Sequence, residues 1–222
     1  MRQFDDLTYV HSVNVALIAS ILGQWLKFSE KDIRILTISG LLHDIGKIMI
    51  PNEILTKPGK LTVAEYNIMK QHVNFGYEKV KNQNIDIRIK EACLLHHEKC
   101  DGTGYPFGLK SDHIPAVAKI IAIADVYDAM TSARVYRGAL CPFEVIDTMC
   151  KDAFTKFEPE YILPFLKNVA SSYINNDVRL SDGRIGKVVL INENALSLPI
   201  VQCEDEFIDL SKTRGLTVSA IL

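Results

Sequence analysis

The chain has 222 residues, of which 48% are apolar and 23% are charged, and its formal net charge is −2. This length suits one domain with a small addition, and the composition is that of an ordinary globular protein. A charge so close to zero excludes a general attraction for a nucleic-acid polymer, so an anionic ligand would need local positive charge.

The first predicted helix spans residues 7–27 and carries two adjacent apolar stripes at helical spacing. One stripe includes Val10 and Leu17, and the other includes His11 and Val15. Because His11 shares its stripe with apolar residues, we expect its imidazole to point into the core.

Ser29, followed by an acidic residue three positions later, predicts the N-cap of a second helix. This helix carries His43 toward the core and ends at Asp44. Residues 48–61 contain two prolines and a glycine and are predicted to form a loop.

Thr62 and Glu65 stand at the spacing of a capping box, which predicts the start of a third helix. This helix runs from about Val63 to Val80 and has His72 in its middle. A fourth helix begins near Ile85 and closes at His96 and His97, again with an apolar face.

Residues 98–115 hold a run of turn-forming residues and are predicted to form a loop. Pro115 then opens a fifth helix, from Ala116 to Met130, which contains Asp125 and Asp128. Two further helices are predicted over residues 142–152 and 159–173.

The pattern changes after Asn175, where short β-type runs replace the helical period. The predicted strands are residues 178–181, 184–191, 198–203 and 207–210, with Asp182-Gly183 as a tight turn between the first two. We therefore predict a mainly α chain, with a helical domain over residues 1–175 and a small β-rich appendage over residues 176–222.

Histidine and aspartate side chains with metal-binding chemistry recur on the inward faces of these helices. Five of the six histidines belong to this set, and only His113 lies in a polar loop. A single buried histidine usually just hydrogen-bonds within a core, but so many in one core favour a shared metal site that satisfies them together. The candidate ligands are His11, His43, Asp44, His72, His96, His97 and Asp125.

Seven ligands exceed the need of one ion, so the set suits two metals bridged by Asp44. Each ion would then keep positions for water and substrate, and a hydroxide shared by the ions could attack a phosphodiester in line. Imidazole and carboxylate ligands without thiolate favour two divalent ions of iron or manganese over structural zinc.

In chain order, these residues resemble the HD-GYP family within the HD phosphohydrolase superfamily. The matching motifs are His11, His43-Asp44-Ile45-Gly46-Lys47, His72, His96-His97-Glu98, Gly104-Tyr105-Pro106 and Asp125. The resemblance covers roughly residues 8–165, and its specificity lies in the ordered set, since either short motif alone means little. It implies an HD-domain helical bundle that hydrolyses the bacterial second messenger cyclic di-GMP to pGpG or GMP.

The resemblance also implies a role for each ligand. His11, His43 and Asp125 would hold one metal, and Asp44 would bridge to the other. The second metal would be held by His72, His96 and His97.

Lys47 and Asp44 are the predicted catalytic residues, and by resemblance Lys47 also touches a substrate phosphate. Further expected substrate contacts are Gly104, Tyr105, Arg134 and Arg137. Arg134 is the better candidate for a substrate contact, because a guanidinium fork suits a phosphate or a guanine edge. Arg137 stands where the family often has another residue.

Two acidic residues have open roles. Asp128 and Glu98 could support the metal ligands, or they could be helix caps and surface charges. Leu7 stands where some family members have a glutamate that serves a third metal, so we expect two metals here.

The chain begins almost at the first motif histidine, where the family usually has more helix preceded by a sensory or receiver domain. We expect either an excised catalytic piece or a short member, and in an excised piece the first helix could lose a partner and homodimerisation could change. Nothing predicts a signal peptide or a membrane span. The five widely spaced cysteines suggest reduced thiols in the cytoplasm.

Two rival functions stay open. One is an HD phosphohydrolase for a mononucleotide or for cyclic GMP-AMP, of which the GYP loop and Arg134 argue against the mononucleotide. The other is a low-activity domain that senses the nucleotide or binds a diguanylate cyclase, although no core ligand is missing.

Overall fold

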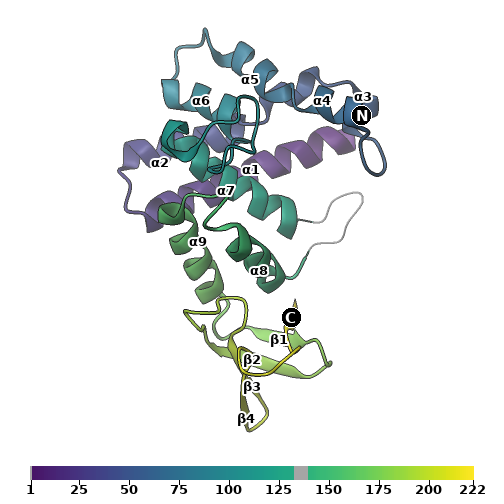
Figure 1. The fold of residues 1–222 in the computed structure, drawn as a ribbon, viewed down its shortest axis with the longest axis vertical. Helices are drawn as coiled ribbons and strands as arrows, with labels where there is room; N and C mark the ends of the chain where they lie inside the picture. The colour runs from purple at the N-terminus through teal and green to yellow at the C-terminus, as the bar shows by residue number, and fades with distance from the viewer. Residues whose placement is uncertain (1, 133–139) are drawn as a thin grey trace.

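The computed structural model describes residues 2–132 and 140–222, with side chains from Thr8 onward in the first helix. A helical body occupies most of the chain and a small sheet lies at one end of the long axis (Figure 1). The helical elements are α1 (Arg2–Trp25), α2 (Glu30–Leu42), η1 (Ile45–Met49), α3 (Asn52–Leu55), α4 (Val63–Met69), α5 (His72–Val80), α6 (Ile87–Leu95), η2 (Ser111–His113), α7 (Ala116–Thr131), α8 (Pro142–Asp152) and α9 (Pro159–Ser172). The strands are β1 (Asp177–Leu180), β2 (Ile185–Leu190), β3 (Ile200–Cys203), β4 (Glu206–Asp209) and β5 (Val218–Ile221).

Helix α7 runs through the middle of the helical body (Figure 1). Its apolar residues are buried on several sides, as expected for a helix surrounded by others. They include Val117, Ala118, Ile120, Ile121, Ile123 and Ala124. The acidic residues of α7 lie near its carboxyl end, so the interior helix carries them to the region where other elements converge.

Several helix starts are confirmed. Ser29 caps α2 by accepting a hydrogen bond from the backbone of Asp32, and Thr62 and Glu65 form the predicted capping box of α4. The single helix predicted from Val63 to Val80 is wrong, because it is two helices. The chain tightens at the junction, where the Gln71 amide bonds Ile68 in an i→i+3 turn, and His72 becomes the first residue of α5.

The predicted loop over residues 48–61 also needs a correction. It contains the end of η1 and the short helix α3. These one-turn elements lack the repeated apolar period that marks longer helices, which is why the composition of the segment indicated only a loop. Likewise α1 begins at Arg2, before the predicted start.

The carboxyl-terminal strands form one antiparallel sheet with the order β4-β3-β2-β1-β5. Gly183, with a φ of 94°, makes the tight turn between β1 and β2, as the Asp-Gly pair predicts. Strand β5 escaped prediction because its pairing with β1 joins segments far apart in sequence. The mainly α fold with a small β-rich end is confirmed.

The buried apolar residues of the sheet belong to the same hydrophobic core as those of α8 and α9. One continuous hydrophobic cluster includes Phe143 and Phe165 from the helices and Val178, Leu180 and Val188 from the sheet. Because both parts share this core, the division of the chain at residue 175 stays a prediction.

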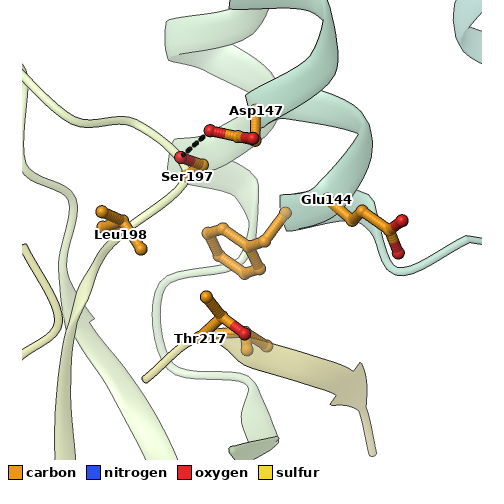
Figure 2. Close-up of a pocket in the computed structure, with 7 residues that line it drawn as sticks. Glu144, Asp147, Ser197, Leu198 and Thr217 are labelled. Carbon is orange, nitrogen blue, oxygen red and sulfur yellow. Dashed lines mark hydrogen bonds between the residues drawn. The ribbon is translucent and has the colours of Figure 1, made fainter. Parts of the chain in front are cut away.

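A cavity of about 320 Å³ lies where α8 meets the sheet (Figure 2). Phe143 of α8 lines it together with Leu198 and Thr217, and the Ser197 hydroxyl donates to Asp147 across it at 3.2 Å. The predicted metal ligands do not line this cavity. Among the described helices, none combines the length and apolar character required to cross a membrane.

Candidate metal centre

The predicted ligands meet inside the helical body, although they come from elements far apart in sequence. His11 lies on α1, His43 and Asp44 follow α2, and His72 starts α5. His96 and His97 follow α6, and Asp125 lies on α7. All of them are buried or half-buried, so their polar atoms face each other and not bulk water.

Gly46 explains how Asp44 and His72 come together. A Cβ atom at this position would lie 1.9 Å from the His72 carbonyl oxygen and 2.4 Å from the Gly76 nitrogen. Only glycine therefore lets η1 lie directly against α5. The backbone approach places the carboxylate that precedes η1 beside the imidazole that begins α5.

Three histidines have their ring orientation set by the backbone. Nδ1 of His43 lies 2.7 Å from the Gly40 carbonyl, Nδ1 of His72 lies 2.8 Å from that of Met69, and Nδ1 of His96 lies 2.9 Å from that of Ala92. A carbonyl can only accept, so Nδ1 carries the proton in each ring. The Nε2 lone pairs are then free to face the interior, which is the arrangement expected of metal-binding histidines.

The two carboxylate oxygens of Asp44 face different histidines. Oδ2 lies 3.3 Å from His43 Nε2 and 3.7 Å from His11 Nε2. Oδ1 lies 3.3 Å from His72 Nε2 and 3.9 Å from His96 Nε2. One side chain therefore borders two separate sets of nitrogen donors.

Asp125 connects the same two sets from α7. Its Oδ1 lies 3.0 Å from His11 Nε2, and its Oδ2 lies 3.9 Å from His97 Nδ1. Ligand atoms that lie within 4.8 Å of one another form two groups, each of a size that can hold a cation. The first group is His11, His43 and Asp125, and the second is Asp44, His72, His96 and His97.

Several buried polar atoms in the cluster have no hydrogen bond with good geometry. They are Nε2 of His11, Nε2 of His43 and Oδ1 of Asp44. In addition, the Nε2 atoms of His72 and His96 face each other at 3.5 Å, although both rings carry their proton on Nδ1. Buried acceptors that face one another are unfavourable by themselves, and a divalent cation would satisfy them. The donor set therefore fits divalent metal ions.

The electrostatics divide the histidines into two kinds. Burial lowers the pKa of His72 and His96, and it lowers the pKa of His97 to about 3. Burial also acts to lower the pKa of His11, but the Asp125 and Asp128 carboxylates outweigh it and raise that pKa to about 9. At neutral pH the first three imidazoles therefore have free lone pairs, while His11 holds a proton that a metal would have to displace.

Asp44 remains ionised in this environment. Burial acts to raise its pKa, but the positive charge of Lys47 and then the neighbouring His43 imidazole hold the pKa well below its usual range. Lys47 Nζ donates directly to Asp44 Oδ2, so the lysine lies at the edge of the cluster. The cluster thus has a carboxylate between its two sets of imidazoles and a cation beside it.

Tyr105 lies against the second set of ligands. Its ring stacks on His97 with centroids 4.7 Å apart and an interplanar angle of 29°, and its amide donates to the His97 carbonyl at 3.2 Å. Gly104 makes this approach possible, since a Cβ atom there would lie 2.4 Å from the Lys99 nitrogen and 2.6 Å from the His97 carbonyl oxygen. The predicted substrate loop therefore packs against His97, just after the end of α6.

Arg134 and Arg137 lie outside the described residues, and their predicted substrate contacts stay predictions.

Asp128, whose role the sequence left open, is buried and its Oδ2 lies 2.6 Å from His11 Nδ1. Asn14 donates to Asp128 Oδ1 at 2.9 Å, and sequence reasoning missed it because an asparagine on a helix has no distinctive pattern. These two residues support the orientation of His11.

The sequence matches the protein family described as HD domain over residues 5–161. A cyclic di-GMP phosphodiesterase of Pseudomonas aeruginosa is 36% identical over 203 residues, which cover 91% of this chain and 49% of that protein. A 3′3′-cGAMP-specific phosphodiesterase of Vibrio cholerae is 36% identical over 158 residues, which cover 70% of this chain and 30% of that protein. The chain thus spans about half the length, or less, of these curated relatives.

A solved structure shares the fold. The HDG"Y"P protein from Bdellovibrio bacteriovorus aligns with a TM-score of 0.60 and 22% identity, over 71% of this chain and 50% of that one. This level of identity supports a common architecture. At this identity, the similarity gives no evidence about the chemistry of the site.

Proposed function

The chain belongs to the HD domain family, as its motifs predict, and we propose that it is a metal-dependent phosphodiesterase that hydrolyses cyclic di-GMP to pGpG, to GMP or to both. The substrate is inferred from the similar Pseudomonas aeruginosa protein, whose name gives this activity. The chain's own motifs support the same substrate through their resemblance to HD-GYP proteins.

One observation carries the proposal of a dinuclear site: Asp44 directs one oxygen toward His11 and His43 and the other toward His72 and His96. A carboxylate placed in this way can bridge two cations. We assign His11, His43 and Asp125 to one cation and His72, His96 and His97 to the other. Two bound cations would supply an activated water nucleophile and stabilise the charge that develops on the phosphodiester.

The residues around the ligands have their own proposed tasks. Lys47, already at the edge of the cluster, would contact a substrate phosphate and neutralise part of its charge. Tyr105 would present its ring beside the centre, where a nucleobase could stack on it. Gly104 would keep the backbone of this loop close to the ligands.

We propose iron or manganese as the native metal, because the ligands found among the described residues are imidazoles and carboxylates, without a thiolate. The cytoplasm is the proposed location, in line with the free state of all five cysteines. A homodimer, an upstream sensory or receiver domain and a diguanylate cyclase partner also stay proposals.

The second candidate substrate is cyclic GMP-AMP. It is favoured by the Vibrio cholerae relative, whose name gives specificity for 3′3′-cGAMP at the same identity as the Pseudomonas protein. Both substrates have the same phosphodiester ring and differ in one base, so the metal ligands cannot separate them. The choice depends on contacts to the base.

A substrate panel tests the proposal. Protein loaded with Mn²⁺ or, without oxygen, with Fe²⁺ is incubated with cyclic di-GMP, cyclic GMP-AMP and a linear dinucleotide, and products are separated by chromatography. The proposal expects turnover of cyclic di-GMP that is lost in His43→Ala and kept in His113→Ala, since His113 is exposed and forms its ion pair with Asp112, away from the cluster. A clear preference for cyclic GMP-AMP would establish the second candidate, and no turnover of either cyclic substrate would contradict both.

A further inference from the structure

Glu98 is a buried carboxylate that the proposed mechanism does not use. It follows His97 directly and is only 4% exposed. Within the described part of the chain, no lysine, arginine or histidine forms an ion pair with it. Its two oxygens instead accept backbone hydrogen bonds, one from the Phe107 amide at 2.7 Å and one from the Leu109 amide at 2.9 Å.

These two amides lie on the segment that follows Tyr105. On the other side of Tyr105, Gly104 sits directly on the backbone of residues 97–99, and the Tyr105 amide bonds the His97 carbonyl. The loop is thus attached to the His97–Glu98 corner both before and after the tyrosine. The attachment that follows Tyr105 depends on the Glu98 side chain.

The base of the loop closes independently of Glu98. The Ser111 amide donates to the Cys100 carbonyl at 3.2 Å, and Asp101 and Lys110 form an antiparallel bridge. Loss of the Glu98 carboxylate would therefore leave the loop closed at its base, but would release the arm that carries Phe107 and Leu109. Tyr105 would then lose part of what fixes its ring beside His97.

We propose that Glu98 is a positioning residue that clamps the loop of residues 102–109 to the metal centre, so that Tyr105 is held in place for substrate before binding. The proposal rests on the proposed function in one respect, namely that Tyr105 contacts a cyclic dinucleotide. Glu98 itself touches neither the metal ligands' donor atoms nor the substrate. It acts through the backbone of the loop.

A carboxylate is suited to this task because both of its oxygens accept. In Glu98→Gln one oxygen becomes an NH2 donor, which cannot pair with a backbone N–H. The variant has almost the same shape but can satisfy only one of the two amides. Asp101→Asn is the matched control, since Asp101 Oδ1 alone accepts both from the Thr103 amide at 2.9 Å and from its hydroxyl at 2.7 Å.

The first experiment follows hydrogen exchange of the Phe107 and Leu109 amides in wild type, Glu98→Gln and Asp101→Asn. We expect exchange about tenfold faster in Glu98→Gln at the amide that loses its acceptor, and unchanged exchange in Asp101→Asn, with the metal content of all three proteins equal. Equal protection in Glu98→Gln would overturn the clamp. This readout does not depend on the substrate, so it stands even if the proposed function fails.

The second experiment measures KM and kcat for cyclic di-GMP in the same proteins and in the Tyr105→Ala background. We expect KM to rise about tenfold in Glu98→Gln with a smaller change in kcat, and no further rise when the change is added to Tyr105→Ala. Equal effects in both backgrounds would mean that Glu98 does not act through Tyr105 and would overturn the positioning role. Absence of turnover in wild type would contradict the proposed function, whereas the exchange result would still decide the clamp.

Discussion

The small sheet and the histidine cluster are built on opposite principles. At the sheet, buried positions such as Val178, Leu180 and Val188 are apolar, and the backbone is paired across the strands. At the histidine cluster, buried positions are polar and several of their atoms, including His43 Nε2 and Asp44 Oδ1, lack a hydrogen bond with good geometry. The first region gains stability from its own packing, whereas the second needs a ligand to satisfy it.

This difference predicts which property each region controls. Changes at the cluster should alter metal content and catalysis, with limited loss of folding stability in the absence of metal. Changes at the sheet should alter stability and leave the metal centre intact.

Asp44→Ala should have the largest effect, because it removes the carboxylate whose two oxygens face His43 and His11 on one side and His72 and His96 on the other. We expect kcat to fall by about a thousandfold, since even loss of a group behind a metal ligand costs roughly 10- to 100-fold. Steady-state hydrolysis of cyclic di-GMP measures it, with His113→Ala as the control. Activity above half of the wild-type value would end the bridging assignment.

Leu180→Ala should have the opposite effect, because it should lower stability without changing the metal centre. Leu180 is 1% exposed in β1, so the change should lower the free energy of unfolding by about 3 kcal/mol while metal content per folded chain stays the same. Chemical denaturation measures the stability. Leu190→Ala is the control, because Leu190 in β2 is 55% exposed and its loss should have little effect. A loss of metal in Leu180→Ala would show that the two regions are coupled.

Lys47→Ala tests the edge of the cluster. The lysine contacts Asp44 but is not one of the proposed ligands, so we expect kcat/KM to fall about tenfold while metal content is unchanged. Kinetics and metal analysis on the same sample give both values. Loss of metal would place Lys47 among the groups that maintain the metal site instead of among the substrate contacts.

Acidification should separate the two sets of ligands. The carboxylates of Asp125 and Asp128 raise the pKa of His11 to about 9, so its imidazole is protonated at neutral pH, and protons compete more strongly with the metal as the pH falls. Burial lowers the pKa of His97 to about 3, so its set should bind metal with little pH dependence near neutrality. We expect affinity at the His11 set to weaken about tenfold per unit from pH 8 to pH 6. Titration calorimetry that resolves two equal pH dependences would contradict this division.

Much of the site could be predicted because histidines on apolar helical faces are uncommon. His11, His43 and His72 stand out by this criterion alone, and their convergence follows once the helices pack. The period could not show which of the two stripes of α1 would be buried. The stripe of His11 faces the core, but Val10 and Leu17 of the other are 50% and 56% exposed.

The remaining features depend on contacts between distant segments. Helix α5 begins where η1 packs against it at Gly46. This contact joins separate segments, so no local sequence pattern could predict the break between α4 and α5. Strand β5 forms because its backbone pairs with that of β1, which is distant in sequence. Asp128 and Glu98 stayed undecided because their partners, the His11 ring and two loop amides, are assembled only by the fold.

The most direct test of the central claim is the number of metal ions per chain in protein prepared without chelator, measured by elemental analysis for wild type and for Asp44→Asn. We expect close to two ions of iron or manganese per chain in wild type and a clear loss in the variant. A wild-type protein that binds no metal under any condition would contradict the proposed dinuclear centre, and the buried histidines would then need another explanation.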